Sequence, residues 1–583
     1  MAKKHKKKFQ ATTQIKTTEL DRERNAGENK QPTDTSNFLS GKYFVPVVTA
    51  LFFLLALSGM LTHEMWRDEH QAWLVARDAD SLTGVFRNMK YEGNPALWQM
   101  VLFIITRFTH NPVYMQVLHL GIATGFIFVF NKYAPVKPLF KVLFTLGYFP
   151  LYEYAVISRS YGLGILLLFI VCALFKNRTS YYILMGVLLA LLANVTIYEV
   201  IISLGIGGIL LLDYIFLQNK SRKLTFQLIT GGSVFLAGVI FSLYQIAPEP
   251  DNSFPAPYAT DVFDFPHWAQ VASRLFTTYF YIPSVESINF WNTNIYFQDG
   301  INTDGLTFYA WLKENPVYLM TWVYMPVLIF LSGILVFLKK PLIMLLYVGL
   351  TLGLLSVFYY TSLYYSRYVG HLFIVLIACW WLAAYYPAKQ YHNILDNLAR
   401  FGSRISKPFL VAVLSVNVIG ALVAYSNDLR YKFTPSKDAA DFIRNNKLDT
   451  LTITGTTDFT LSSIASYLNA KIFYPQMNDF GSFCIWNKHR KNDMSFAEQV
   501  ESIHTLINKQ KSKKLLWIKD NPPFLTLNGR NAPFERGIIG DNIQVDLLRS
   551  FETGIVPDEK FSIFLLQVVD TSKIDYSKYP LIN

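Results

Sequence analysis

The chain has 583 residues, of which 52% are hydrophobic and only 16% are charged. A soluble domain carries roughly 25% charged residues, so this composition excludes an ordinary soluble protein and indicates a membrane protein. The formal net charge of +12 does not indicate a nucleic-acid partner. Its excess lies in an N-terminal tail and in short loops between apolar segments, where positive charge sets membrane topology. The three cysteines lie far apart in the sequence and suggest neither a disulfide framework nor a zinc site.

Residues 1–42 form a polar tail that begins with a cluster of lysines. Such a sequence buries too little apolar surface to fold, so we expect a disordered tail on the cytoplasmic side. Two interpretations of its lysines stay open, namely contact with anionic membrane lipid and a role limited to fixing the orientation of the chain. These lysines are Lys3, Lys4, Lys6, Lys7 and Lys8.

Residues 43–426 contain apolar segments that predict a bundle of about eleven transmembrane helices, since a helix needs about 20 apolar residues to cross a bilayer. With a cytoplasmic tail, the short basic loops all fall on the inner side only if the apolar segment 96–110 does not cross. That segment is short and carries Arg107, so we expect an interfacial or re-entrant helix there. The predicted spans are 43–62, 113–131, 139–157, 161–176, 181–197, 199–217, 225–246, 317–338, 341–361, 367–387 and 408–426.

This topology places the loops 63–112 and 247–316 and the segment 427–583 on the outer side of the membrane. In 427–583, strand-like and helix-like segments alternate, which predicts a soluble α/β domain. The loop 247–316 is rich in aromatic residues, which suit either sugar stacking or the membrane interface. The predicted strands are Thr450–Thr454, Lys471–Tyr474, Lys513–Ile518 and Ser562–Val569, and the predicted helices are Phe459–Asn469 and Phe496–Gln510. The aromatic residues of the loop are Phe254, Tyr258, Phe265, Trp268, Tyr279, Tyr281, Trp291 and Tyr296.

The first outer loop opens with the acidic pair Asp68 and Glu69, shortly after a predicted span. Trp66, Trp73 and Leu74 share one face at helical spacing, which leaves the two acids at the membrane surface. A carboxylate in that place can act as a general base and accept a proton from an attacking hydroxyl or amine. The alternative is an acidic cap on an interfacial helix, since exposed acids are common.

A span followed by an Asp-Glu pair on an outer juxtamembrane helix resembles the GT-C superfamily of polyprenyl-phosphate-sugar glycosyltransferases. Protein O-mannosyltransferases and the lipid A aminoarabinose transferase are members. Glu92–Trp98 resembles the family's His-Pro-Pro-Leu-Tyr segment, with Asn94 in place of the usual histidine. Tyr154–Leu163 is similar to the family's Ser-Arg…Arg-Pro-Tyr-Ala-Leu turn, with Ser160 in place of the proline, and Ser366–Tyr368 looks like its Arg-Tyr element. The matches lie within about 43–390 and leave the C-terminal domain without a matching motif.

The resemblance implies a donor sugar joined to a polyprenyl phosphate and an acceptor that is a glycan, a lipid or a protein. It implies that Asp68 is the general base, with Glu69 as the next candidate. Arg367 and Arg159 would bind the donor phosphate and stabilise the charge that develops on it, or else serve only as interfacial anchors. The remaining candidates for substrate binding are Glu92, Asn94, Glu153, Tyr161 and Glu199.

Glu153 and Glu199 lie near the outer ends of predicted spans, where a carboxylate is costly unless it is paired or faces water. Glu153 either pairs with Arg159 or shapes the acceptor site, and Glu199 allows the same two kinds of interpretation. Asp78 and Asp80 form an Asp-Ala-Asp sequence that can offer oxygen ligands to Mg²⁺ or Mn²⁺. Such sequences occur often by chance, and the mannosyl- and aminoarabinosyl-transferring relatives work without metal, so we expect no metal cofactor.

We therefore predict a mainly α-helical, multi-pass glycosyltransferase of GT-C type in a bacterial inner membrane, with its active site and C-terminal domain outside the cytoplasm. A transporter or flippase of lipid-linked saccharides is the alternative. It would show repeated halves and spans broken by glycine or proline near mid-membrane. No repeat is evident, and the ionisable residues gather at the outer ends of the spans. A non-catalytic scaffold, the third hypothesis, leaves Asp68, Glu69 and Arg367 without a role.

Overall fold

The computed structural model describes residues 41–253, 264–285, 288–296, 308–520, 524–527, 530–533, 535–570, 572 and 574–582. The chain divides into two units, Met1–Val47 and Val48–Asn583. Most of the predicted disordered tail, 1–42, lies outside the described residues, as do Phe254 and Tyr258 of the aromatic loop.

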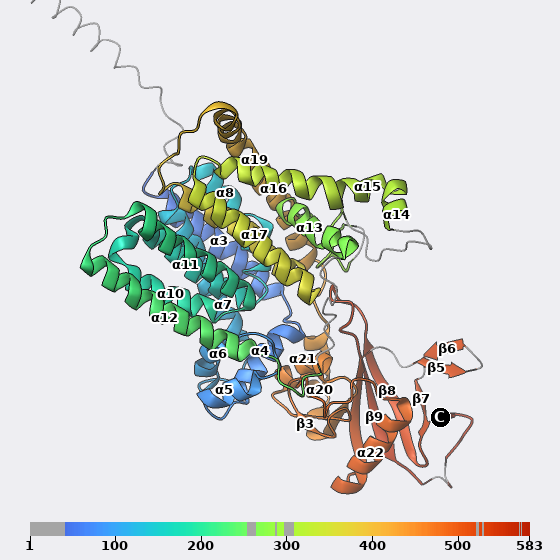
Figure 1. The fold of residues 1–583 in the computed structure, drawn as a ribbon. Coiled ribbons are helices and arrows are strands. Elements are labelled where there is room, and N and C mark those ends of the chain that lie inside the picture. The colour runs from blue at the N-terminus through green and yellow to red at the C-terminus, as the bar shows by residue number, and fades with distance from the viewer. Residues whose placement is uncertain are drawn as a thin grey trace, which may run out of the picture. The chain divides into compact units, whose positions relative to one another are not determined.

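The chain is a multi-pass membrane protein (Figure 1). Among the described residues, nine helical segments are long and apolar enough to cross a membrane. They are α3 (Phe44–Thr62), α7 (Val113–Tyr133), α9 with its following turn (Tyr161–Ser180), α11 (Ile197–Leu217), α12 (Arg222–Ile246), α15 to α16 (Pro316–Phe337), α17 (Pro341–Thr361), α18 (Ser366–Ala383) and α19 (Asn393–Asp428). The predicted helical membrane bundle is thereby confirmed.

Two of the predicted spans are shorter or broken in the structure. The segment 139–157 divides into α8 (Pro138–Thr145) and the π-helix η1 (Tyr148–Glu153), because Gly147 between them has an extended backbone. The segment 181–197 contains α10 (Tyr182–Ala193), of 12 residues. The segment predicted not to cross contains α6 (Leu97–Thr106), of 10 residues. Since crossing takes about 20 residues, the predicted count of eleven spans stays a prediction.

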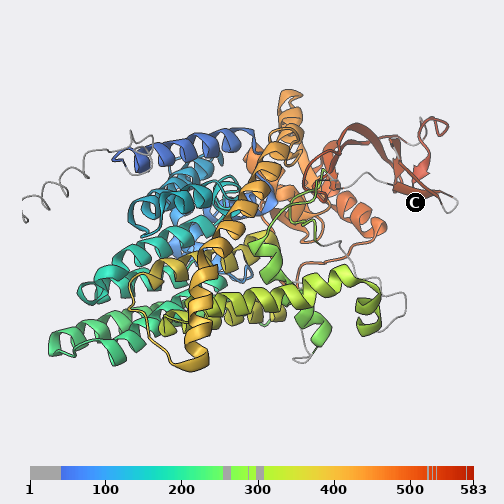
Figure 2. The same cartoon turned by 90° about the horizontal axis from the view of Figure 1, so that it is seen from above.

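Close helix packing inside the bundle depends on small residues. Helices α10 and α12 lie side by side (Figure 2), and a Cβ atom on Gly186 would lie 2.1 Å from the carbonyl oxygen of Gly231. Such an approach of two backbones is possible only without side chains at the crossing point, as is common between membrane helices. Elsewhere, α7 packs on α9, and α11 packs on α17.

The C-terminal region is an α/β domain, and its described residues form an eight-stranded mixed sheet with the strand order β10-β7-β8-β9-β4-β1-β2-β3. Along β4 the side chains alternate between faces. Leu516 and Ile518 join the core under α20 and α21, whereas Leu515 and Trp517 join the core under α22, as the two-residue period of a strand requires. The helices of the domain are α20 (Ser436–Asn445), α21 (Asp458–Leu468) and α22 (Phe496–Gln510). The strands of the large sheet are β1 (Thr452–Gly455), β2 (Ile472–Tyr474), β3 (Asp479–Gly481), β4 (Lys514–Asp520), β7 (Arg536–Ile539), β8 (Ile543–Phe551), β9 (Phe561–Val568) and β10 (Leu581–Ile582).

The C-terminal domain packs on the segment 63–112, which the sequence predicts to be the first outer loop. Helix α21 lies against α4 (Arg67–Arg77), which follows α3. The side chain of Gln71 on α4 donates to the carbonyl oxygen of Cys484 at 2.9 Å and accepts from its backbone N–H at 3.0 Å. The first turn of α4, which carries the predicted acidic pair, therefore lies where the membrane bundle meets the α/β domain.

Candidate active site

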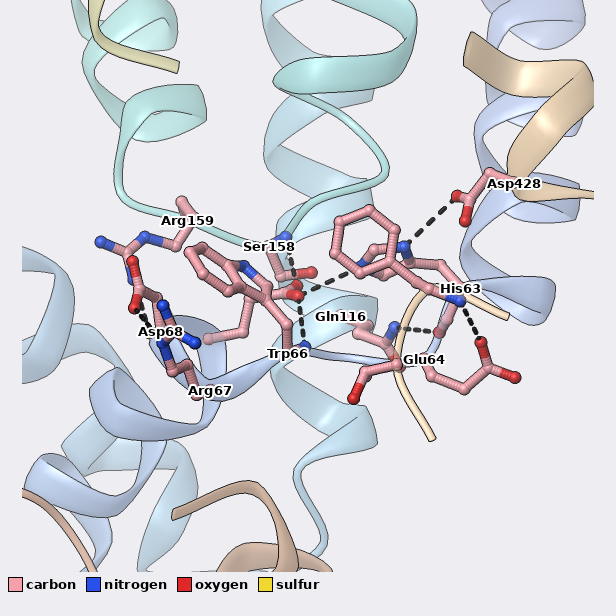
Figure 3. Close-up of polar contacts among 12 residues, drawn as sticks. His63, Glu64, Trp66, Arg67, Asp68, Gln116, Ser158, Arg159 and Asp428 are labelled. Carbon is pink, nitrogen blue, oxygen red and sulfur yellow. Dashed lines mark hydrogen bonds and ion pairs between the residues drawn. The ribbon is translucent and has the colours of Figure 1, made fainter. Parts of the chain in front are cut away.

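Asp68 and Glu69 are neighbours in sequence, but the structure gives them different surroundings. Figure 3 shows Asp68 beside Arg67 and Arg159. Glu69 is fully buried and accepts hydrogen bonds from the backbone N–H of Ser158 at 2.6 Å and of Trp66 at 3.1 Å. Its Oε2 also lies 3.1 Å from Nε2 of His63. Burial raises the pKa of Glu69, but His63 and these hydrogen bonds lower it further, so the net shift is downward. Glu69 thus anchors α4, and its role as the reserve base stays a prediction.

His63 completes this buried network at the end of α3. Its Nδ1 lies 3.3 Å from Oδ2 of Asp428, the last residue of α19. Burial alone lowers the pKa of His63, but Glu69 and Asp428 outweigh it and raise the pKa to about 10. A positively charged imidazole between two carboxylates therefore ties together α3, α4 and the end of α19.

Asp68 is the partly exposed member of the pair, and arginines surround it. Its Oδ2 lies 3.5 Å from Nη1 of Arg159 and 3.5 Å from Nη2 of Arg367, and its Oδ1 lies 3.9 Å from Nε of Arg67. Arg159 also donates to the backbone carbonyl of Asp68 at 2.5 Å. Close pairs of arginine and carboxylate have N···O distances of about 2.7–2.9 Å. The carboxylate is therefore held loosely within an excess of positive charge.

The guanidinium group of Arg367 is enclosed by aromatic rings. The residue is 6% exposed, and its Nε has no hydrogen-bond partner among the described residues. Buried guanidinium groups normally use their donors on carboxylates or phosphates. An anion with several oxygen atoms would satisfy this site. The ring centroids lie 4.6 Å away for Tyr365 and Tyr368, 5.1 Å for Trp66 and 5.5 Å for Trp291.

In the described structure, Glu153 lies beside Arg367 and makes no ion pair with Arg159. An ion pair with Arg159 was one of the two interpretations that the sequence allowed. Its Oε2 accepts from the hydroxyl of Tyr148 at 2.7 Å, from the hydroxyl of Ser366 at 3.0 Å and from the indole N–H of Trp291 at 3.2 Å. Its Oε1 is buried and has no hydrogen-bond partner within the part of the chain that the structure describes. This carboxylate therefore fixes Ser366, and with it the first turn of α18 that carries Arg367.

Glu199 and Tyr161 belong to a second buried cluster, centred on His371. Oε1 of Glu199 lies 3.0 Å from Nε2 of His371, one turn after Arg367 on α18. The ring of Tyr161 lies 5.6 Å from the His371 ring and 6.0 Å from the guanidinium of Arg159. Sequence analysis missed His371, although a histidine four residues after Arg367 in an apolar span is a signal that could have identified it.

Glu92 interacts with Asp68 through charge, and its hydrogen-bond partner is Gln71. The amide of Gln71 donates to Glu92 Oε1 at 2.7 Å. Burial raises the pKa of Glu92, and the charge of Asp68 adds to this, although Gln71 and Arg159 act in the opposite direction. The amide of Asn94 donates to the carbonyl oxygen of Glu92 at 3.4 Å.

The acids of the Asp-Ala-Asp sequence each have partners within the chain. Asp78 pairs with Arg77 at 2.6 Å, and Asp80 pairs with Arg87 at 2.9 Å. Within the described part of the chain, no three histidine, cysteine, aspartate or glutamate side chains gather in a group that could hold a metal ion.

No protein-family model and no curated protein matches the chain. Among solved structures, the chain is similar to the crystal structure of ArnT from Cupriavidus metallidurans bound to undecaprenyl phosphate. The TM-score is 0.42 at 11% sequence identity, and the match covers 90% of this chain and 98% of that chain. This likeness is one of fold and assigns no role to any residue.

Proposed function

We propose that this protein transfers a sugar from a polyprenyl-phosphate donor to an acceptor on the outer side of the membrane. The observation that carries this proposal is the position of the Asp68 carboxylate, whose Oδ2 lies 3.5 Å from both Arg159 Nη1 and Arg367 Nη2. One carboxylate and several arginines at the ends of apolar helices suit a reaction that needs both a proton acceptor and a stabilised phosphate leaving group.

The donor phosphate binds between Arg159 and Arg367. Arg367 lies in the first turn of α18, and Arg159 lies just before α9, so both cations lie at the ends of membrane helices. A lipid phosphate arrives at that depth with its polyprenyl chain in the bilayer. Both guanidinium groups lie 3.5 Å from the Asp68 carboxylate, and phosphate oxygens offer shorter, bidentate hydrogen bonds.

The reaction then exchanges one bond at the anomeric carbon of the sugar. A hydroxyl or amine of the acceptor attacks this carbon, and Asp68 takes the proton of the acceptor. The bond from the anomeric carbon to the phosphate oxygen breaks, and its electron pair leaves with the polyprenyl phosphate. Arg159 and Arg367 stabilise the charge that develops on that oxygen, so the step requires no metal.

Glu92 is our candidate for acceptor recognition. Its carboxylate interacts electrostatically with both Asp68 and Arg159, and its hydrogen bond to Gln71 fixes its orientation. A second carboxylate at this place suits an acceptor with a hydroxyl or amine donor. Asn94, Tyr161 and Glu199 remain proposed substrate contacts. Glu153 supports the arginine site through its contact with the first turn of α18.

The test is turnover of a panel of polyprenyl-phosphate sugars by the purified protein, with and without a metal chelator. We expect at least one donor to be consumed, with release of polyprenyl phosphate and with no effect of the chelator. Asp68→Asn should lower the rate by about 10²–10⁴-fold, the range for a lost general base. The matched control is Asp80→Asn, because Asp80 lies on the same outer loop and pairs only with its neighbours Arg87 and Ser81. If no donor is consumed, the proposed transfer is wrong.

A further inference from the structure

The loop between β8 and β9 reaches from the C-terminal domain to the first turn of α4. Its backbone pairs with the segment after α19, through Ile555 N–H to Lys432 O at 2.9 Å and Val556 N–H to Phe433 O at 3.0 Å. The amide of Asn289 also donates to the carbonyl oxygen of Ile555 at 2.8 Å. The loop is therefore fixed from two sides before it meets α4.

Glu559 of this loop holds the backbone of α4. The residue is fully buried, and its Oε1 accepts from the backbone N–H of Arg67, the first residue of the helix, at 2.7 Å. Its Oε2 accepts from the hydroxyl of Thr434 at 2.5 Å. A carboxylate at a helix N-terminus satisfies a backbone donor that has no partner within the helix and interacts favourably with the helix dipole. Glu559 thereby fixes the residue that precedes Asp68.

Asp558, the preceding residue, holds the side chain of Arg67. Asp558 Oδ2 lies 2.6 Å from Arg67 Nη2, whereas the nearest carboxylate oxygen of Asp68 lies 3.9 Å from Arg67 Nε. The guanidinium also stacks between Trp66 at 5.3 Å and Phe459 of the C-terminal domain at 5.2 Å. Arg67 thus makes its close ion pair with Asp558 and only a distant one with Asp68.

We propose that Asp558 and Glu559 are positioning residues through which the C-terminal domain sets the geometry of Asp68. This proposal rests on the proposed function, in which Asp68 is the base. Glu559 fixes the first turn of α4, and Asp558 keeps Arg67 from closing on Asp68. The other charged groups near Asp68 are Arg159, Arg367 and Glu92, and neither loop residue contacts them in the described structure.

The sharpest test is Asp558→Asn, which frees Arg67 to pair closely with Asp68. An arginine that binds the carboxylate oxygens of Asp68 directly leaves them less free to accept the proton of the acceptor. We expect kcat to fall about tenfold. The donor KM should change by less than about twofold, because Arg159 and Arg367 are untouched. Adding Arg67→Gln to Asp558→Asn should restore kcat, which a merely structural role would not produce.

The matched control is Glu552→Gln, an exposed carboxylate in the same loop that should leave kcat unchanged. Glu559 is tested with two variants. Glu559→Gln keeps the oxygen that accepts from Arg67, and Glu559→Ala removes it. We expect only Glu559→Ala to lower kcat strongly, and thermal unfolding of each variant identifies a protein that has failed to fold.

The outcomes separate the two proposals. If Asp68→Asn is inactive while Asp558→Asn keeps the wild-type kcat, the positioning proposal is wrong and the proposed function stands. Failure of Arg67→Gln to rescue Asp558→Asn would also overturn the positioning proposal. If the wild type consumes no donor, both proposals fail together.

Discussion

At the scale of single residues, the proposed function needs Arg367 as a planar donor of several hydrogen bonds and not only as a positive charge. Arg367→Lys keeps the charge but loses the bidentate geometry that suits phosphate. We expect the affinity for the polyprenyl-phosphate donor to fall about 10- to 100-fold, since a hydrogen bond to a charged group contributes about 1.5–3 kcal/mol. Equilibrium binding of a labelled donor measures this. Arg87→Lys on the exposed pair with Asp80 is the control, and equal losses in both variants would contradict the assignment.

The buried network around His63 predicts a pH dependence of stability. The pKa of His63 is about 10 in the folded protein and 6.5 as its ordinary value. A raised pKa means that the stabilisation is complete below about pH 6.5 and is lost as the pH rises through 10. We expect the melting temperature of the purified protein to fall from pH 7 to pH 10.

His63→Gln should remove much of that decline, because glutamine does not titrate. The exposed His489 provides the control, and His489→Gln should keep the wild-type pH dependence. Identical pH profiles for wild type and His63→Gln would show that the charged network does not form.

Residue types and order predicted Asp68, Arg159 and Arg367 as site candidates, and the structure brings these three together. The different surroundings of Asp68 and Glu69 could not be predicted, because they depend on the backbone N–H of Ser158, 89 residues away from Glu69. The contact of Arg67 with Asp558 spans even more of the sequence. Such pairings are set by tertiary packing, which no local pattern encodes.

At the scale of elements, the close approach of α10 and α12 predicts that Gly186 tolerates no side chain. Gly186→Ala places a methyl group 2.1 Å from the Gly231 carbonyl oxygen, so we expect destabilisation of about 1–3 kcal/mol, as for other overpacked sites. Gly208→Ala on α11 is the matched control, since a Cβ there meets no atom within 4 Å. Thermal unfolding compares the two, and a smaller loss for Gly186→Ala would contradict the packing.

Hydrophobic patterns identified the elements that rely on local sequence. The helix predicted at Phe496–Gln510 is observed with those bounds, and Lys513–Ile518 and Ser562–Val569 correspond to β4 and β9. The sequence analysis did not identify β3, β7, β8 and β10, and several of these are short strands whose partners lie elsewhere in the sheet. The break at Gly147 was also missed, because the apolar run continues through it and hides a change from α8 to η1.

At the scale of the whole molecule, the positive-inside rule predicts opposite sides for the C-terminal domain and the basic loop before α12. All three native cysteines are buried, so single cysteines can be introduced as reporters. We expect a membrane-impermeant maleimide to label the exposed Asp541→Cys in intact cells and to leave Lys223→Cys unlabelled until the cells are opened. The reverse pattern would overturn the predicted topology.

The central claim is that donor binding and proton transfer belong to different residues of one cluster. The most direct measurement is a single turnover of pre-bound, sugar-labelled donor after mixing with acceptor, in wild type and Asp68→Asn. Asp68→Asn removes the base but leaves Arg159 and Arg367 in place. We predict that it binds the donor at least as tightly as wild type and releases almost no polyprenyl phosphate. Transfer by Asp68→Asn at the wild-type rate would contradict the account.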